Sequence, residues 1–287
     1  MVKARFRIFV FSSITAIALA VFHFYPLSGI YAKEKKGEVQ KPWKVGEVLH
    51  YTVYYKVGYI YIPGVRARLT IVKESDENNS KVLHISGSAV SNKLVDLFFK
   101  VRDSISCAYD WKNRVPLWDR KSLREGNYFR EYEALFHNHA RTATFSQKEF
   151  NGNTDVKGVV NKNAKWKEKK GTISKLKPYT QSVCSSIFYL RHNAVSTSIG
   201  SSIVIPLFDD GKKNSLKLTV VEKKKVEIEA GIFAALVLKP KYKKNGAFTS
   251  KGKTMLYVSD DKNRYLLKAE SDLPVIGQIL VELVKIE

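Results

Sequence analysis

The sequence predicts an all-β, mainly antiparallel fold: a strongly curved sheet, incomplete β-barrel or sandwich, with one amphipathic helix near residues 180–191. Three observations predict it. Segments with an apolar residue at every second position recur along the chain. Polar turn sequences separate these segments, and helices do not alternate with them as they do in a doubly wound α/β fold. The 287-residue chain is 44% hydrophobic, which is enough to bury a sizeable core.

The first alternating segment follows a short charged stretch. Its apolar side chains would share one face of a strand: Leu49, Tyr51, Val53, Tyr55 and Val57. Gly58 and the Pro63-Gly64 pair then turn the chain into a second alternating run at residues 65–71. Polar residues from Asp76 to Ser80 predict a hairpin turn before a third strand at residues 81–90.

The same pattern continues through the middle of the chain. Apolar residues between 101 and 111 share a face, and residues 128–150 form one long strand or two shorter ones before the turn at Asn151-Gly152. The segment at residues 158–177 is rich in lysine and poor in large aliphatic residues. We expect it to form a loop or an edge hairpin.

Two more hairpins and a last strand are expected near the C-terminus. Residues 203–208 and 215–221 flank Asp209-Asp210-Gly211, and residues 255–259 and 265–269 flank a polar turn. Residues 279–286 are apolar on both faces, which favours a strand covered on both sides.

One segment has helical spacing instead. Apolar residues recur there every three or four positions: Val183, Cys184, Ile187, Phe188 and Leu190. Pro178 lies near the start of this segment and Asn193 near its end. We predict an amphipathic helix that packs on the sheet.

The N-terminus predicts export. Lys3, Arg5 and Arg7 precede an apolar run at residues 8–25, and we place a signal peptide at residues 1–32 with cleavage after Ala32. A charged linker at residues 33–41 and a single β-rich exported domain at residues 42–287 would follow. The alternative is that residues 8–25 remain as an inner-membrane anchor. In both cases the domain would lie in the periplasm.

The charge suggests the kind of partner. Lysine and arginine number 49 against 27 acidic residues, a net charge of +22. Such a chain is attracted to anionic lipid, lipopolysaccharide or acidic glycan, and could make peripheral membrane contact. Export argues against nucleic acid as the partner. Because the lysines are spread along the chain, the alternative is a merely solvated surface. The oligomeric state is not predicted.

Candidate catalytic and metal sites are weak. His137 and His139 would project from one face of a strand, but no third ligand stands at a suitable spacing, so we predict no metal site. No motif for a cofactor or a catalytic nucleophile is present. The acidic pairs Asp209-Asp210 and Asp260-Asp261 fall at hairpin tips, where aspartate stabilises turns. We therefore assign no catalytic or cofactor-binding residue.

The two cysteines, Cys107 and Cys184, both fall on predicted apolar faces. An oxidising compartment would allow a disulfide between them if they meet in the core. The alternative is two separate buried thiols, and two cysteines are too few for a disulfide-rich scaffold.

An ordered set of segments carries a family resemblance over nearly the whole exported part. The segments are Pro42 to Leu69, Asp103 to Asp110, Ser122 to Glu133, Gln181 to Arg191, Val226 to Pro240, Leu256 to Ser271 and Ile276 to Leu283. In this order they resemble a bacterial exported family known only as domain of unknown function 3108. The resemblance implies a β-rich protein of the bacterial envelope without an assigned reaction.

These observations favour a non-enzymatic envelope protein that binds or carries an amphiphile or an anionic envelope polymer. One alternative is a scaffold or assembly partner of an envelope complex. Another is a glycan- or peptide-cleaving hydrolase whose carboxylates meet only in the fold, for example Glu47, Asp103 and Glu131.

Overall fold

The computed structural model describes residues 41–77, 80–152, 165–193, 197–244, 247–249, 253–273 and 277–287. The predicted signal peptide at residues 1–32, the alternative anchor at residues 8–25, and the predicted linker up to residue 40 lie outside the described residues. Neither helix in the described ranges combines the length and the apolar character needed to cross a bilayer.

The described strands form one antiparallel sheet. They are β1 (Val48–Val57), β2 (Ile60–Glu77), β3 (Ser80–Ser91), β4 (Arg102–Asp110), β5 (Val115–Glu125), β6 (Tyr128–His137), β7 (Thr142–Asn151), β8 (Lys167–Ile173), β9 (Ser202–Asp209), β10 (Lys212–Ile228), β11 (Gly231–Lys244), β12 (Ala247–Thr249), β13 (Thr254–Ser259), β14 (Leu266–Leu273) and β15 (Gly277–Ile286). The order is β8-β7-β6-β5-β4-β3-β2-β1-β15-β14-β13-β11-β10-β9, with β12 beside β11. The sheet ends at β8 and β9 and does not close, which confirms the predicted all-β, incomplete-barrel fold.

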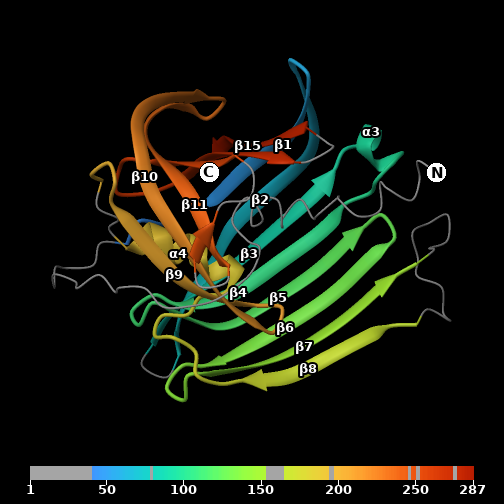
Figure 1. Ribbon diagram of the computed structural model, residues 1–287, viewed down its shortest axis with the longest axis vertical. Coiled ribbons are helices and arrows are strands. Elements are labelled where there is room, and N and C mark those ends of the chain that lie inside the picture. The colour runs from blue at the N-terminus through green and yellow to red at the C-terminus, as the bar shows by residue number, and fades with distance from the viewer. Residues whose placement is uncertain are drawn as a thin grey trace.

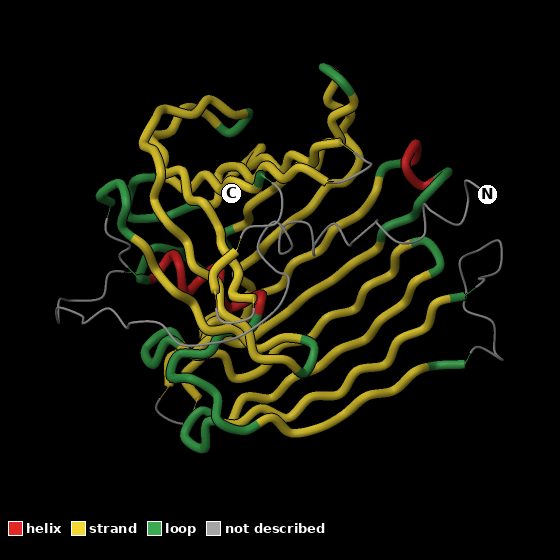
Figure 2. Tube along the Cα trace, in the orientation of Figure 1, coloured by secondary structure: helices red, strands yellow, loops and turns green. Residues whose placement is uncertain are grey.

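The sheet curls so that its two halves face each other. Strands β2–β8 form a broad twisted wall, and β9–β11 cross in front of it (Figure 1). In the described residues the helices are two short segments within a framework of strands: α3 (Lys93–Asp96) and α4 (Val183–His192) (Figure 2). Helix α4 packs against β4, β5 and β9, so it lies between the two halves.

Burial follows the predicted alternation along β1. Leu49, Tyr51 and Val53 are at most 3% exposed and belong to the main core, whereas His50 and Thr52 between them are half-buried. Each large apolar side chain removed from water contributes roughly 1.5–3 kcal/mol. The inner faces of both halves of the sheet supply this core together with Cys184 and Phe188 of α4.

Several predicted boundaries differ from the structure. The second strand begins at Ile60, not at residue 65, because β1 and β2 stay paired as a ribbon up to the turn, where Val57 pairs with Ile60, and β15 accompanies β1 as far as Lys56. Residues 128–150 form two strands, β6 and β7. Part of the lysine-rich segment is the edge strand β8. The rest of that segment, residues 158–164, lies outside the described residues.

Helix α4 begins where its sequence can cap it. The Ser182 side chain accepts a hydrogen bond from the Ser185 N–H (3.1 Å), and the Ser185 hydroxyl accepts one from the Ser182 N–H (2.9 Å). This reciprocal capping box satisfies two backbone donors at the helix start. The helix ends at His192, and the backbone N–H of its C-cap residue Asn193 still donates to the Tyr189 carbonyl. The predicted helix is therefore present, beginning three residues later than predicted.

The free edge of β9 is partly covered by the chain that leads into α4. The Gln181 N–H donates to the Pro206 carbonyl, and the Phe208 N–H donates to the Gln181 carbonyl, both at 2.8 Å. At the end of β9, Asp210 and Gly211 both have positive φ, as a two-residue hairpin turn of type I′ requires. The predicted hairpin at these residues is confirmed.

Candidate functional site: an exposed apolar rim

Two connections at one edge of the sheet lie side by side. In an antiparallel sheet every second connection lies at the same end of the strands. The β1–β2 turn and the β3–β4 connection therefore lie next to each other at one end of these strands. The Asn92 N–H donates to the Gly64 carbonyl (2.9 Å), and Asn92 Nδ2 donates to the Pro63 carbonyl (2.6 Å). We call residues 58–63 and 92–100 the apolar rim. The α3 end of the rim and the raised β1–β2 ribbon are visible in Figure 1.

The rim gathers apolar side chains that face solvent. Of fifteen large hydrophobic residues exposed in the described part of the chain, seven lie there. They are Tyr59 (98% exposed), Ile60 (67%), Tyr61 (41%), Ile62 (45%), Leu94 (71%), Leu97 (75%) and Phe98 (87%). Single exposed apolar residues are ordinary, whereas a concentration of them marks an interaction surface.

The rim is supported from below. Asn92 caps α3 by accepting a hydrogen bond from the Val95 N–H (2.9 Å). Phe99 is half-buried and packs beside Gly126, where even a Cβ atom would come within 3.0 Å of its ring. Phe98 and Leu97 consequently project outward from a connection whose two ends are fixed.

Basic residues accompany the apolar ones. Lys93 and Lys100 are exposed, and the Lys56 ammonium lies 5.1 Å from the centre of the Tyr61 ring. The one acidic residue within the rim, Asp96, is paired with Arg102 (2.6 Å), and hydrogen bonding from Arg102 lowers the pKa of Asp96. Because Asp96 is already paired with Arg102, the positive charges of the rim lysines are largely uncompensated by other residues of the rim.

Helix α4 and core side chains pack between the two halves of the sheet in the described part of the chain. A cavity of about 30 Å³ remains beside the helix, lined by Tyr51, Leu69, Ile105, Val183, Ile187 and neighbouring residues. Sites for small organic ligands have about 300–1,000 Å³. This cavity has no room for an acyl chain.

Asp209 and Asp210 do more than form a turn. From the hairpin tip Asp209 reaches Lys121 on β5, and Asp210 reaches Arg130 on β6. Burial raises the pKa of Asp209. For Asp210 burial has the same tendency, but Lys121 and Arg130 outweigh it and lower its pKa. Each carboxylate has a cationic partner, so the pair fixes the hairpin against the opposite wall of the sheet.

The second acidic pair behaves as predicted for a turn. Asp261 accepts hydrogen bonds from the Asn263 N–H (2.9 Å) and the Arg264 N–H (3.1 Å). Asp260 pairs with Arg264 (2.9 Å) and Lys223 (3.2 Å). Backbone donors within the turn are thereby satisfied.

The two histidines lie apart from any cluster of metal ligands in the described chain. His137 is exposed at the end of β6, and His139 is exposed in the turn that follows. The described residues contain one group of three side chains close enough to hold a metal ion, and neither histidine belongs to it.

The three carboxylates weighed for a hydrolase have different surroundings. Glu47 is 7% exposed and pairs with Arg191, while Asp103 is 3% exposed and accepts a hydrogen bond from the Arg124 N–H (2.9 Å). Glu131 is exposed on β6. The structure does not join the buried residues and the exposed one in a common cleft.

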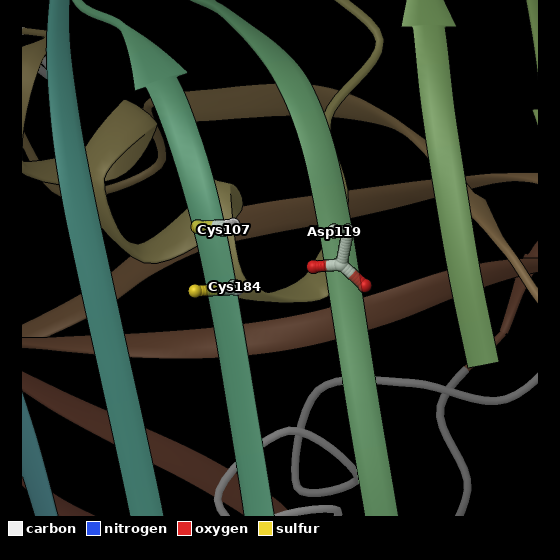
Figure 3. Close-up of side chains that lie close together, drawn as sticks. All are labelled: Cys107, Asp119 and Cys184. Carbon is white, nitrogen blue, oxygen red and sulfur yellow. The ribbon is translucent and has the colours of Figure 1, made fainter. Parts of the chain in front are cut away.

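Cys107 on β4 and Cys184 on α4 do meet in the core. Their sulfur atoms and a carboxylate oxygen of Asp119 on β5 all lie within 4.8 Å of one another, and all three residues are buried (Figure 3). Burial, followed by hydrogen bonding to Cys184, raises the pKa of the Cys107 thiol. Asp119 was not anticipated, because no strand was predicted at β5.

The chain matches the family model described as "Protein of unknown function (DUF3108)" over residues 50–284. The chain belongs to this family. The resemblance of the ordered segments is thus confirmed, and the matched residues include β1 to β15 almost entirely. Comparison of this DUF3108 protein with curated proteins gives no match.

Three solved structures are similar to the DUF3108 chain, each over 85% of its length. One is a β-barrel-like protein of domain of unknown function DUF1849 from Brucella abortus (10% identity, 97% of that chain, TM-score 0.49). The second is a candidate exported protein with a YmcC-like fold from Bacteroides fragilis (7%, 96%, 0.36). The third is a candidate lipoprotein from Parabacteroides distasonis (9%, 96%, 0.32).

Proposed function

We propose that this DUF3108 protein is a non-enzymatic, periplasmic envelope protein that binds the surface of an anionic membrane through the apolar rim. The observation that carries the proposal is the concentration of exposed apolar side chains at the rim, seven of the fifteen in the described chain, beside uncompensated lysines. The predicted signal peptide and the net charge of +22 support the same location and partner.

The chemistry of the rim suits the boundary between headgroups and acyl chains. Tyrosine and phenylalanine are favoured at that depth, and lysines beside them attract anionic headgroups. Each lysine near such a surface contributes about 1 kcal/mol, and each fully inserted Leu, Ile or Phe side chain roughly 1.5–3 kcal/mol. A few rim residues acting together would therefore hold the domain reversibly on a bilayer.

The interior of the protein supports binding to a membrane surface better than it supports carriage of a lipid inside the fold. Helix α4 occupies the space that an open half-barrel would leave, and the cavity beside it has about 30 Å³. The buried carboxylate Glu47 is paired with Arg191, and both Asp209 and Asp210 have cationic partners. These pairings favour structural roles for them over hydrolysis.

Vesicle co-sedimentation tests the proposal. The exported protein is mixed with vesicles of phosphatidylcholine alone, or of phosphatidylcholine and phosphatidylglycerol in equal parts, over a salt series. We expect binding to the anionic vesicles only, weakening as salt rises. The double variant Leu97→Ser/Phe98→Ser should lose most of this binding.

A matched pair of variants separates the rim from general hydrophobicity. Ile60 in the rim and Ile199 before β9 are almost equally exposed, at 67% and 66%. Ile60→Ser should weaken vesicle binding and Ile199→Ser should not. Equal effects of the two, or rim-dependent capture of a protein partner with no vesicle binding, would overturn the membrane proposal; the second result would favour a scaffold.

A further inference from the structure

We propose that Cys107 and Cys184 form an intramolecular disulfide that fixes α4 to the sheet. The chain holds two cysteines, separated by the four strands β5–β8 and the segment that leads into α4, and the fold brings them together. Their sulfur atoms, unbonded in the structure, are within 4.8 Å of each other. This proposal rests on export to the periplasm, which is part of the proposed function.

The local geometry leaves little to change on oxidation. A disulfide requires the sulfur atoms about 2.05 Å apart. Cys184 is in the first turn of α4 and Cys107 faces it from β4, so rotation of the two side chains and a small shift of that turn would close the distance. The helix start is fixed by the Ser182 capping box and by the pairing of Gln181 with β9. The two sulfur atoms are therefore held opposite each other.

Charge favours the disulfide over a pair of thiolates. Cys107 is 0% and Cys184 1% exposed, and the Asp119 carboxylate beside them is 1% exposed. A thiolate here would be a buried anion next to another potential anion, and burial already raises the pKa of Cys107. A disulfide carries no charge and removes two buried polar S–H groups.

A metal ion is the competing occupant of the same three residues. Structural zinc is usually held by four protein ligands, whereas the group in the described chain offers two cysteines and one carboxylate. Binding would also require both thiols to lose their protons in a buried setting. The donor set therefore suits an S–S bond better than a closed zinc site.

The reaction requires an oxidant, which we take to be a thiol–disulfide oxidoreductase or a small disulfide in the same compartment. One cysteine thiolate attacks a sulfur of the oxidant's disulfide, forming a mixed disulfide and releasing one thiol. The second cysteine thiolate then attacks the first cysteine's sulfur, forming the Cys107–Cys184 bond and releasing the second thiol. The two cysteine protons end on the oxidant, which is reduced. Because both sulfurs are buried after folding, exchange would occur before α4 docks.

Thiol trapping tests the proposal on the full chain. The protein is taken from the periplasmic fraction, denatured in acid, alkylated before or after reduction, and weighed by mass spectrometry. We expect no alkylated thiol before reduction and two after it. Two alkylated thiols before reduction, or one bound zinc per chain measured by atomic emission, would overturn the proposal.

A refolding experiment tests the Cys107–Cys184 pairing independently of whether the protein is exported. Reduced, denatured protein is refolded with a mixture of oxidised and reduced glutathione. We expect a monomeric product with the intramolecular bond, whose unfolding midpoint falls when reductant is added. The double variant Cys107→Ala/Cys184→Ala should show no response to reductant. Free thiols or disulfide-linked dimers after refolding would contradict the Cys107–Cys184 pairing. If the refolded protein forms this disulfide but the protein in the cell proves to be cytosolic, only the proposed function is contradicted.

Discussion

Arg191 at the end of α4 and Glu47 ahead of β1 form a buried ion pair with two contacts. Nη1 lies 2.5 Å from Oε1 and Nη2 lies 3.0 Å from Oε2, between residues 144 positions apart in sequence. Arg191 also donates from Nη2 to the Pro42 carbonyl (2.5 Å) and from Nε to the Asn263 carbonyl (2.9 Å). The central helix is thus joined to the entry of β1 and to the β13–β14 turn by one guanidinium group.

Loss of this guanidinium should destabilise the fold severely. Arg191→Met leaves the Glu47 carboxylate buried without a cation, which costs about 3–5 kcal/mol of unfolding free energy. The exposed pair Arg120–Glu133, at 2.7 Å, is the matched control, and Arg120→Met should cost less than about 1 kcal/mol. Urea unfolding followed by circular dichroism measures both. Similar costs for the two variants would contradict the structural role given to Arg191.

Asp119 should make the fold less stable as pH rises. Burial raises the pKa of Asp119 from 3.8 to about 6. The folded state therefore holds the proton more tightly, so this group's contribution is complete below pH 3.8 and is lost as pH rises through about 6. The cost of the buried charge at higher pH is on the order of 3 kcal/mol. Asp119→Asn should accordingly gain stability over the native protein near neutral pH and gain little in acid, as urea unfolding at several pH values would measure. A gain independent of pH would rule this out.

His192 should have the opposite effect to Asp119: it should make the fold less stable as pH falls. Burial, and then the positive charge of Arg114, lowers the pKa of His192 to about 4, and its ring contacts Trp43 and Trp111. The folded state prefers the neutral ring, so stability present above the ordinary value of 6.5 is lost as pH falls toward 4. Partial exposure limits the effect to about 1–2 kcal/mol. His192→Phe should flatten this part of the pH profile of thermal unfolding; an unchanged slope would show that another group titrates.

Gly211 should tolerate no side chain. It has φ +68° in the β9–β10 turn, and a Cβ atom there would collide with the Phe145 ring. Gly200 also has positive φ (+89°), with nothing within 4 Å of its Cβ position. Gly200→Ala should therefore cost only about 1 kcal/mol, from the backbone conformation, and Gly211→Ala clearly more. Equal unfolding free energies for the two variants would mean that the hairpin does not press on β7 as described.

The rim lysines should govern the electrostatic part of membrane binding. Reversing both rim charges in Lys93→Glu/Lys100→Glu removes at least about 2 kcal/mol of attraction to an anionic surface, roughly thirty-fold in affinity. Lys262→Glu, in the exposed β13–β14 turn, is the control and should change affinity only slightly. Vesicle titration at low and high salt measures this. If the control weakened binding as much as the rim variant, the attraction would belong to the whole surface.

The sequence allowed most of the core strands to be predicted, because their burial alternates with period two, as along Leu49, Tyr51 and Val53. Strand β5 escaped prediction for a physical reason. Asp119, Lys121 and Glu125 occupy its inward positions, so the apolar alternation that indicates a half-buried strand is missing. The partner that compensates the charge of Lys121, Asp209, is far away in sequence.

The candidate site was less accessible to sequence analysis. Ile60 and Ile62 are residues typical of a buried strand. Only the structure shows that they lie on a ribbon that extends beyond the core. Leu97 and Phe98 resemble any apolar loop anchor, and their neighbour Phe99 does serve as one. Exposure depends on which side chains the rest of the fold covers, and local pattern does not contain that information.

Amide hydrogen exchange with and without anionic vesicles tests the membrane-binding claim most directly, because it locates the contact on the chain. The account predicts slower exchange in residues 58–63 and 92–100 when phosphatidylglycerol-containing vesicles are added, and no change with phosphatidylcholine vesicles. Protection that falls elsewhere, such as on the lysines at residues 223–225 of β10, with the rim exchanging as fast as in solution, would contradict it.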